Sequence, residues 1–158
     1  PQTLLVKKAS GIKSMADMAG KRFGLDAGSG AVKNVPRAQP KAIVQTFQNW
    51  PEAFFALERG TVDAVATDNL LLAGLRAASP DPSAYEVVGK EGFYGGAYYA
   101  AVVRENDSKS RDAINFLLQD QWKDGTWMAI FDKWLGKDSA LKMTLADFND
   151  FSIPIWDE

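Results

Sequence analysis

The amino-acid sequence predicts an α/β fold in which helices flank a largely parallel sheet. Short apolar runs of strand length alternate along the chain with segments of helical spacing, which is the pattern of such folds. The run at residues 62–67 is almost continuously apolar, as expected of a strand buried on both faces. With 158 residues, 46% of them apolar and 24% charged, the chain can bury a core within one medium domain or two small lobes.

The first expected elements are a strand at residues 3–8 and a short helix. Ser14 and Asp17 have the spacing of a capping box, which marks the start of a helix. Gly20 is expected to end this helix, because glycine best tolerates the left-handed conformation that follows a helix. A second strand is expected at residues 22–26.

A glycine-containing turn, Gly28-Ser29-Gly30, follows the second strand. Ser29 is expected to cap a short helix over about residues 30–35. We expect Pro36 to end or kink this helix, because the proline ring interferes with the helical turn before it.

The middle of the chain carries clear helix boundaries. After an expected strand at residues 42–47, Asn49 precedes a helix with proline in its first turn, where the missing amide costs nothing. Gly60 is expected to close that helix. Asp68 directly follows the apolar run described above and is placed to cap a helix at residues 69–78.

The last third of the chain is expected to be mainly helical. Strands are expected near residues 85–88 and at 97–104, and they precede helices at 108–123 and 126–135, which Gly125 separates. Each of these helices has an apolar stripe rich in aromatic residues. A packed core or a docking face accounts for such stripes better than a cofactor site does.

The composition excludes several classes of function. The chain has no histidine and no cysteine, so a Ser-His-Asp triad, a histidine-ligated metal and a thiolate site are impossible within it. Its 18 basic and 20 acidic residues are well mixed, so no basic stripe predicts nucleic-acid binding. No apolar stretch approaches the roughly 20 residues that span a bilayer. We therefore expect no cofactor, no metal and no nucleic-acid partner.

The turn at Gly28 and Gly30 is not a phosphate loop. Lys33 lies too early and no Ser or Thr follows it, and the third glycine of a dinucleotide fingerprint is absent. The amides of Ser29, Gly30 and Ala31 at a helix N-terminus would nevertheless form a cradle for an anion such as a carboxylate. A tight strand-to-helix turn without any ligand explains the glycines equally well.

Asp68 is the second candidate site residue. It follows a strand at the edge where open α/β sheets place their ligands, so its carboxylate could receive an ammonium group. Helix capping alone also explains the residue, because Asp is a preferred N-cap. The residues themselves leave both interpretations open.

Four phrases of the sequence occur together in the order and at the spacing of one protein family. They are TLLVKKASGIKSMADMAGKRFGLDAGSGA, AFFALERGTVDAVATDN, YYAAVVREND and DGTWMAIFDKWLG, and they cover nearly all of the chain from Thr3 to Gly136. In these phrases the chain resembles the extracellular solute-binding proteins of polar amino-acid ABC transporters, solute-binding protein family 3. The resemblance implies the type II periplasmic binding fold, in which two α/β lobes close around a ligand.

The resemblance also implies a domain organisation. Residues 9–96 would be the complete second, ligand-binding lobe. Residues 1–8 and 97–158 would be the hinge strands and the C-terminal part of a first lobe whose opening segment is absent. The missing lobe would be supplied by the rest of a longer chain, by another chain or by self-association. The tail at 137–158 extends past the usual end of the family and has no assigned role.

The site residues follow from the resemblance as well. The turn Gly28-Ser29-Gly30-Ala31 would hold the α-carboxylate of an amino acid, and Asp68 its α-ammonium. The chain departs from the family at Gly30, where a threonine is common, so one hydroxyl is missing.

The implied function is a non-enzymatic one. The protein would capture a polar amino acid outside the cytoplasm, in the periplasm or on the cell surface, and deliver it to a membrane permease. Two alternatives share the fold: a dehydratase acting on a prephenate-like or arogenate-like substrate, and the ligand-sensing domain of a membrane receptor kinase. The sequence does not identify the amino acid.

Overall fold

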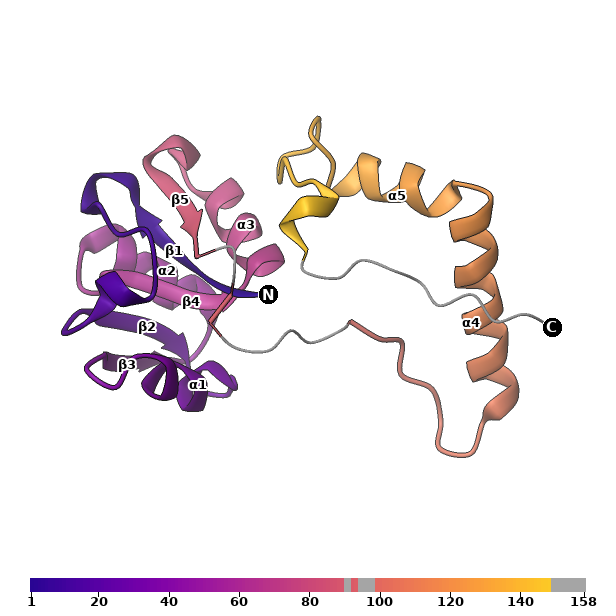
Figure 1. The fold of residues 1–158 in the computed structure, drawn as a ribbon, viewed down its shortest axis with the longest axis horizontal. Helices are drawn as coiled ribbons and strands as arrows, with labels where there is room; N and C mark the ends of the chain where they lie inside the picture. The colour runs from indigo at the N-terminus through magenta and orange to yellow at the C-terminus, as the bar shows by residue number, and fades with distance from the viewer. Residues whose placement is uncertain (90–91, 94–98, 149–158) are drawn as a thin grey trace. The chain divides into compact units, whose positions relative to one another are not determined.

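The computed structural model describes residues 1–89, 92–93 and 99–148 (Figure 1). The chain divides into two compact units, Pro1–Gly96 and Ala97–Glu158. The first unit contains a sheet with α-helices around it, and the second contains two further α-helices.

The first unit is built on a five-stranded sheet with the order β3-β2-β4-β1-β5. Strand β2 pairs in parallel with β3 and β4, whereas β1 pairs antiparallel with both β4 and β5. Four strands therefore run in one direction and β1 in the other, which confirms the predicted α/β class and adds one antiparallel strand. The strands are β1 (Gln2–Lys7), β2 (Arg22–Asp26), β3 (Ile43–Phe47), β4 (Ala64–Asp68) and β5 (Tyr85–Val88).

Helices cover both faces of this sheet. Alternate side chains of β1 enter two hydrophobic clusters, with Leu4 on one face and Leu5 on the other. The first cluster includes Val35 of α1, and the second includes Leu57 of α2 and Leu72 of α3. The unit thus has three layers, α1 on one face and α2 and α3 on the other. These helices are α1 (Ala31–Ala38), α2 (Trp50–Arg59) and α3 (Asn69–Ala78).

Several predicted helix ends are confirmed. The side chain of Asn49 accepts a hydrogen bond from the Glu52 amide and caps α2, and Gly60 ends that helix with a φ of 75°. The side chain of Asp68 accepts from the Leu71 amide and caps α3. These boundaries depend on side chains within one turn of the helix end, so the sequence alone reveals them.

Helix α1 corrects two predictions. Ser29 does not cap it: the Ser29 hydroxyl donates to the Asp26 carbonyl at 2.8 Å, and the N-cap residue is Gly30. Pro36 does not end it either, because α1 continues to Ala38, whereas a kink at Pro36 stays a prediction. The helix tolerates the proline because the fixed φ of proline is helical, and burial of Val35 in the core holds the backbone in place.

Two other predicted elements differ from the structure. The short helix after Ser14 is a 3₁₀ turn, Ala16–Met18, although the Asp17 carboxylate does accept from the Ser14 amide as expected of a capping box. Residues 99–104 form no strand, and Val102 among them is 96% exposed. Residues 97 and 98 of that predicted strand lie outside the described residues. A hinge role for residues 1–8 and 97–104 stays a prediction.

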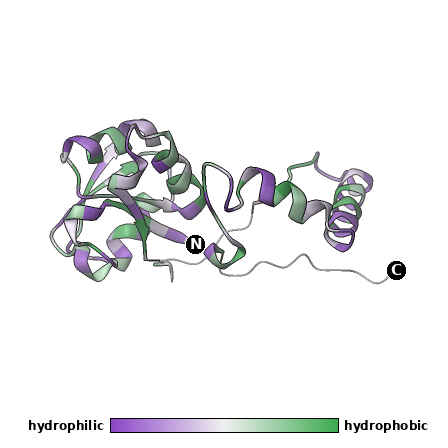
Figure 2. Ribbon diagram, turned by 90° about the horizontal axis from the view of Figure 1, so that it is seen from above, coloured by the Kyte–Doolittle hydropathy of each residue, from purple (hydrophilic) through white to green (hydrophobic). Residues whose placement is uncertain are grey.

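The second unit contains α4 (Ser108–Lys123) and α5 (Thr126–Trp134). The side chain of Asp107 caps α4 by accepting from the Ser110 amide, and Gly125 separates the helices with a φ of 82°. A ring contact joins the helices, since the ring centroid of Trp127 of α5 lies 5.5 Å from that of Trp122 of α4. Within α5, Trp127 also stacks on Phe131 at 5.4 Å between centroids. Polar and apolar residues alternate along the helices of both units (Figure 2).

Much of the apolar surface of the second unit is exposed. The exposed large apolar side chains of α4 and α5 are Phe116, Leu117, Leu118, Ile130 and Trp134. Among the described residues, no helix combines the length and hydrophobicity needed to cross a membrane.

Candidate functional site

The sheet brings the two predicted site segments to the same edge. Strands β2 and β4 are parallel neighbours, with Phe23 opposite Ala64 and Gly24 opposite Val65. The glycine turn follows β2 and Asp68 ends β4, so both lie where these strands finish. The carboxyl ends of neighbouring parallel strands are where open α/β sheets bind ligands.

The turn after β2 uses part of its hydrogen-bonding capacity internally. The Gly28 amide donates to the Asp26 carboxylate at 2.7 Å. The amide of Ser29 donates to the Asp26 carbonyl at 3.0 Å, and its hydroxyl donates to the same oxygen at 2.8 Å. Within the described part of the chain, the amides of Gly30 and Ala31 make no hydrogen bond. Free donors are therefore concentrated at the first turn of α1.

The backbone of this turn does not itself require glycine at position 30. Gly30 has a φ of −62° and a ψ of −19°, which any residue adopts in a helix. A Cβ atom added there would lie 3.8 Å from Nδ2 of Asn34, an ordinary van der Waals contact. Conformational necessity therefore does not explain this glycine.

Asp68 has a demonstrated structural role. Its Oδ1 accepts from the Leu71 amide at 2.9 Å at the start of α3, and the residue is half-buried. The capping prediction is confirmed, whereas the ammonium-binding role stays a prediction. The two roles are compatible, because a carboxylate can accept several hydrogen bonds at once.

Two residues near this edge were missed by the sequence analysis. Gln2 lies directly opposite Asp68 in the β1–β4 pair. Its Oε1 accepts a hydrogen bond of 3.3 Å from Nδ2 of Asn34, a residue of α1 that is only 9% exposed. The contact joins residues 32 positions apart, so no local pattern could have revealed it.

Acidic residues elsewhere have mainly structural partners. Hydrogen bonds from Ser110 lower the pKa of the capping residue Asp107, and the bond from the backbone amide has a larger effect than the bond from the hydroxyl. The hydroxyl of Ser83, followed by backbone amides, lowers the pKa of Asp81 in a 3₁₀ turn. These shifts reflect caps and turns and do not indicate acid–base catalysis. Within the described residues, no cluster of three or more potential ligands is suited to hold a metal ion.

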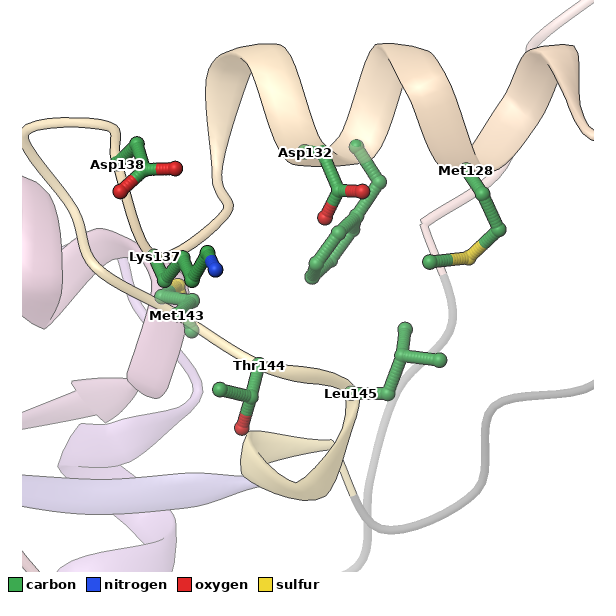
Figure 3. A pocket seen from close by; sticks show the side chains of 8 residues that line it. Met128, Asp132, Lys137, Asp138, Met143, Thr144 and Leu145 are labelled. Atoms are coloured by element: carbon green, nitrogen blue, oxygen red, sulfur yellow. The ribbon is translucent and has the colours of Figure 1, made fainter.

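A hollow of about 280 Å³ lies in the second unit beside α5 (Figure 3). Apolar side chains and three charged ones, Asp132, Lys137 and Asp138, surround it. None of the predicted site residues lines this hollow. Its complete lining is Met128, Phe131, Asp132, Lys137, Asp138, Met143, Thr144 and Leu145.

Comparison with known proteins identifies relatives among transport proteins. No model of a known protein family matches the sequence. The ABC transporter glutamine-binding protein GlnH of Bacillus subtilis is 34% identical over 140 residues, which cover 88% of this chain and 50% of the relative. The glutamine-binding protein of Geobacillus stearothermophilus is 42% identical over 81 residues, 51% of this chain and 31% of the relative. The matched segments thus cover half or less of the length of these two relatives.

Solved structures agree with these relatives. An ancestral arginine-binding protein bound to glutamine matches with a TM-score of 0.68 and 35% identity, over 85% of this chain and 59% of that one. An ancestral amino-acid-binding protein described as a precursor of cyclohexadienyl dehydratase matches with a TM-score of 0.65 and 28% identity, over 86% of this chain and 58% of that one. Both support the periplasmic-binding-protein-like fold.

Proposed function

Because the chain belongs to the family of amino-acid-binding proteins of ABC transporters, we propose that it forms a ligand-binding lobe for a polar amino acid. The amides at the start of α1 bind the α-carboxylate of the ligand, and Asp68 binds its α-ammonium. The loaded protein delivers the amino acid to the membrane permease of the transporter. It works in the periplasm or at the outer cell surface, and it associates with the membrane through the transporter.

One observation supports this proposal: a group that favours an anion and a group that favours a cation lie at the same edge of the sheet. Gly30 and Ala31 offer unbonded amides at the positive end of a helix, which favours an anion. Asp68 ends the neighbouring parallel strand and offers a carboxylate. A zwitterionic amino acid supplies one partner for each, and charged partners strengthen both sets of hydrogen bonds.

The proposed ligand is a neutral or cationic polar amino acid, with glutamine as the first to test. Two of the relatives are named as glutamine-binding proteins, and two matching ancestral structures hold glutamine or arginine. Gly30 lacks the hydroxyl that the family resemblance implies at this position, so the backbone amides take a larger share of carboxylate binding here.

The remainder of the binding cleft comes from outside the first unit. The matches cover only 50% and 31% of the length of the two glutamine-binding relatives, which supports a second lobe in the functional protein. We propose that it is supplied by the rest of a longer polypeptide, by another chain or by self-association.

An enzymatic function is the second candidate. It is favoured by one similarity, to an ancestral binding protein described as a precursor of cyclohexadienyl dehydratase. The named curated relatives are binding proteins, so transport remains the first proposal. Product formation from prephenate or arogenate would support the enzyme; its absence in the presence of amino-acid binding would support transport.

The Asp68→Asn substitution tests the binding proposal. Asparagine caps helices as well as aspartate does, so α3 keeps its cap while the charge is removed. We expect the free energy of amino-acid binding to weaken by about 2–4 kcal/mol, because a desolvated ammonium loses its counter-charge. The measurement is an NMR titration of the ¹⁵N-labelled chain with glutamine, arginine and glutamate, which also detects millimolar affinities.

Asp107→Asn is the matched control, because Asp107 also caps a helix, α4 in the other unit, by accepting from the amide three residues later. This variant should bind like the wild type. Equal affinities for the wild type and Asp68→Asn would refute the role of Asp68. Chemical-shift changes that do not include Gly30 and Ala31 would refute the carboxylate cradle. The absence of binding by every amino acid tested would refute amino-acid binding by this lobe.

A further inference from the structure

A side-chain contact links the two halves of the proposed site. Asn34 lies one helical turn after Gly30, and its amide donates to the Gly30 carbonyl at 3.1 Å. Its side-chain Nδ2 donates to Oε1 of Gln2 at 3.3 Å. Gln2 in turn lies opposite Asp68 on the adjoining strand. A side-chain hydrogen bond and a strand pairing therefore connect the first turn of α1 to the end of β4.

The backbone around Gln2 is anchored as well. The carbonyl of Pro1 accepts from the Asn69 amide at 3.1 Å, and the carbonyl of Gln2 accepts from the Phe93 amide at 3.2 Å. Residues that face each other in an antiparallel pair have neighbouring side chains on the same face of the sheet. The Gln2 side chain is therefore held beside Asp68 by the strand pairing and beside α1 by Asn34.

We propose that Gln2 is a positioning residue for the ligand, acting through Asn34. The link between their carboxamides sets the spacing between the α1 amides and the Asp68 carboxylate. This proposal rests on the proposed function, because the spacing matters only for a ligand that bridges the two. Neither residue needs to contact the ligand.

The buried position of Asn34 explains why the link is maintained. A buried carboxamide costs free energy unless its donors and acceptor find partners, and Gln2 supplies an acceptor for the Asn34 side chain. Because Oε1 of Gln2 accepts this hydrogen bond, the Gln2 carboxamide is oriented with its NH₂ group away from Nδ2 of Asn34. Ligand binding then meets a preorganised edge, which lowers the entropy lost on binding.

Two uncharged substitutions remove the link. Gln2→Met keeps the length of the side chain and removes the acceptor, whereas Asn34→Leu keeps approximate volume and removes the donor. Each should weaken amino-acid binding about three- to tenfold, the value of one hydrogen bond. The double variant should lose no more affinity for the amino acid than the weaker-binding single variant does, because both substitutions break the same hydrogen bond.

Gln39→Met is the matched control. Gln39 follows the other end of α1, and its Nε2 donates to the Met15 carbonyl at 3.2 Å, so the variant also loses a carboxamide hydrogen bond that anchors α1. It should lower stability like Gln2→Met but leave affinity unchanged. Thermal unfolding of all variants separates stability from affinity, and titrations are compared only where the protein is folded.

The ligand-free chain provides an independent readout. Gln2→Met should shift the ¹⁵N–¹H resonances of Gly30 and Ala31, whereas Gln39→Met should leave them in place. Additive losses in the double variant, or an equal loss of affinity in Gln39→Met, would overturn the positioning role. If the wild type binds no amino acid, the proposed function fails; unchanged Gly30 and Ala31 resonances in Gln2→Met would instead show that the link itself does not act.

Discussion

Individual glycines in this chain have opposite physical roles. Gly60 has a φ of 75° after α2, the left-handed region that disfavours other residues. Gly30 has a helical φ of −62° before α1. A Cβ atom would meet no atom within 4 Å at Gly60 and only Nδ2 of Asn34, at 3.8 Å, at Gly30. Backbone conformation, rather than space, therefore decides the effect of substitution at each position.

Replacing each glycine by alanine should change stability in opposite directions. Gly30→Ala should stabilise the fold by about 0.4–1 kcal/mol, because alanine restricts the unfolded chain without straining a helical backbone. Gly60→Ala should destabilise it by about 1 kcal/mol or more through strain at positive φ. Urea-induced unfolding of both variants measures the two effects. Destabilisation by Gly30→Ala would contradict the conformation assigned to the turn.

At the scale of elements, an ion pair connects β2 to the chain just before β4. The guanidinium of Arg22 donates to the Asp63 carboxylate from Nε at 3.0 Å and from Nη2 at 2.8 Å. The Arg22 amide donates to the same carboxylate at 2.8 Å. The side-chain hydrogen bonds from Arg22 are the main cause of the lowered pKa of Asp63, its backbone amide adds to them, and burial opposes them.

This pair should make stability depend on acidic pH. The folded-state pKa of Asp63 lies below its ordinary value of 3.8, so the folded state holds the charged form more strongly than the unfolded state does. The stabilisation is therefore present above pH 3.8 and is lost as the pH falls through the lower folded-state pKa. Asp63→Asn should cost about 1 kcal/mol at neutral pH, a value limited by solvent screening of the partly exposed pair.

Thermal unfolding of Asp63→Asn and the wild type between neutral and strongly acidic pH checks this expectation. The difference between them should shrink only in the acidic range. Asp112→Asn is the control, because the ion pair of Asp112 with Arg111 is more exposed and contributes little to stability. The Asp112 side chain is 42% exposed and the Arg111 side chain 60%. A wild-type advantage that persists below the folded-state pKa of Asp63 would contradict the assignment.

The whole molecule combines a well-packed unit with one that exposes apolar surface. The core of the first unit is buried on both faces of its sheet. In the second unit, Leu117 on α4 is 55% exposed and Trp134 on α5 is 66% exposed. Apolar surface of this kind commonly mediates contacts between proteins. It supports the proposal that another lobe or chain covers these helices.

The isolated 158-residue chain should therefore self-associate. Leu117→Ser should weaken association, because burying a side chain of this size contributes about 1 kcal/mol or more. Phe55→Ser is the control: Phe55 is 51% exposed but lies in the first unit, on α2. Sedimentation velocity at micromolar concentration measures the effect. A monomeric wild type, or equal effects of the two variants, would contradict association through α4.

Local signals allowed the sequence by itself to determine most helix boundaries and the α/β class. Asn49, Gly60 and Asp68 act within one turn of the helix ends that they define, so their neighbours in sequence are their partners in space. The same holds for Gly125 in the second unit. The glycine turn and Asp68 could be selected as candidates because both directly follow expected strands.

Only the tertiary structure decided the features that depend on distant partners. The antiparallel place of β1 between β4 and β5, the continuation of α1 past Pro36, and the contact of Gln2 with Asn34 are not encoded in any short window. The free energy of each comes from packing or hydrogen bonds between residues far apart in the chain. The expected strand is likewise not formed at 99–104, since strand formation depends on pairing with a distant segment that the local sequence does not specify.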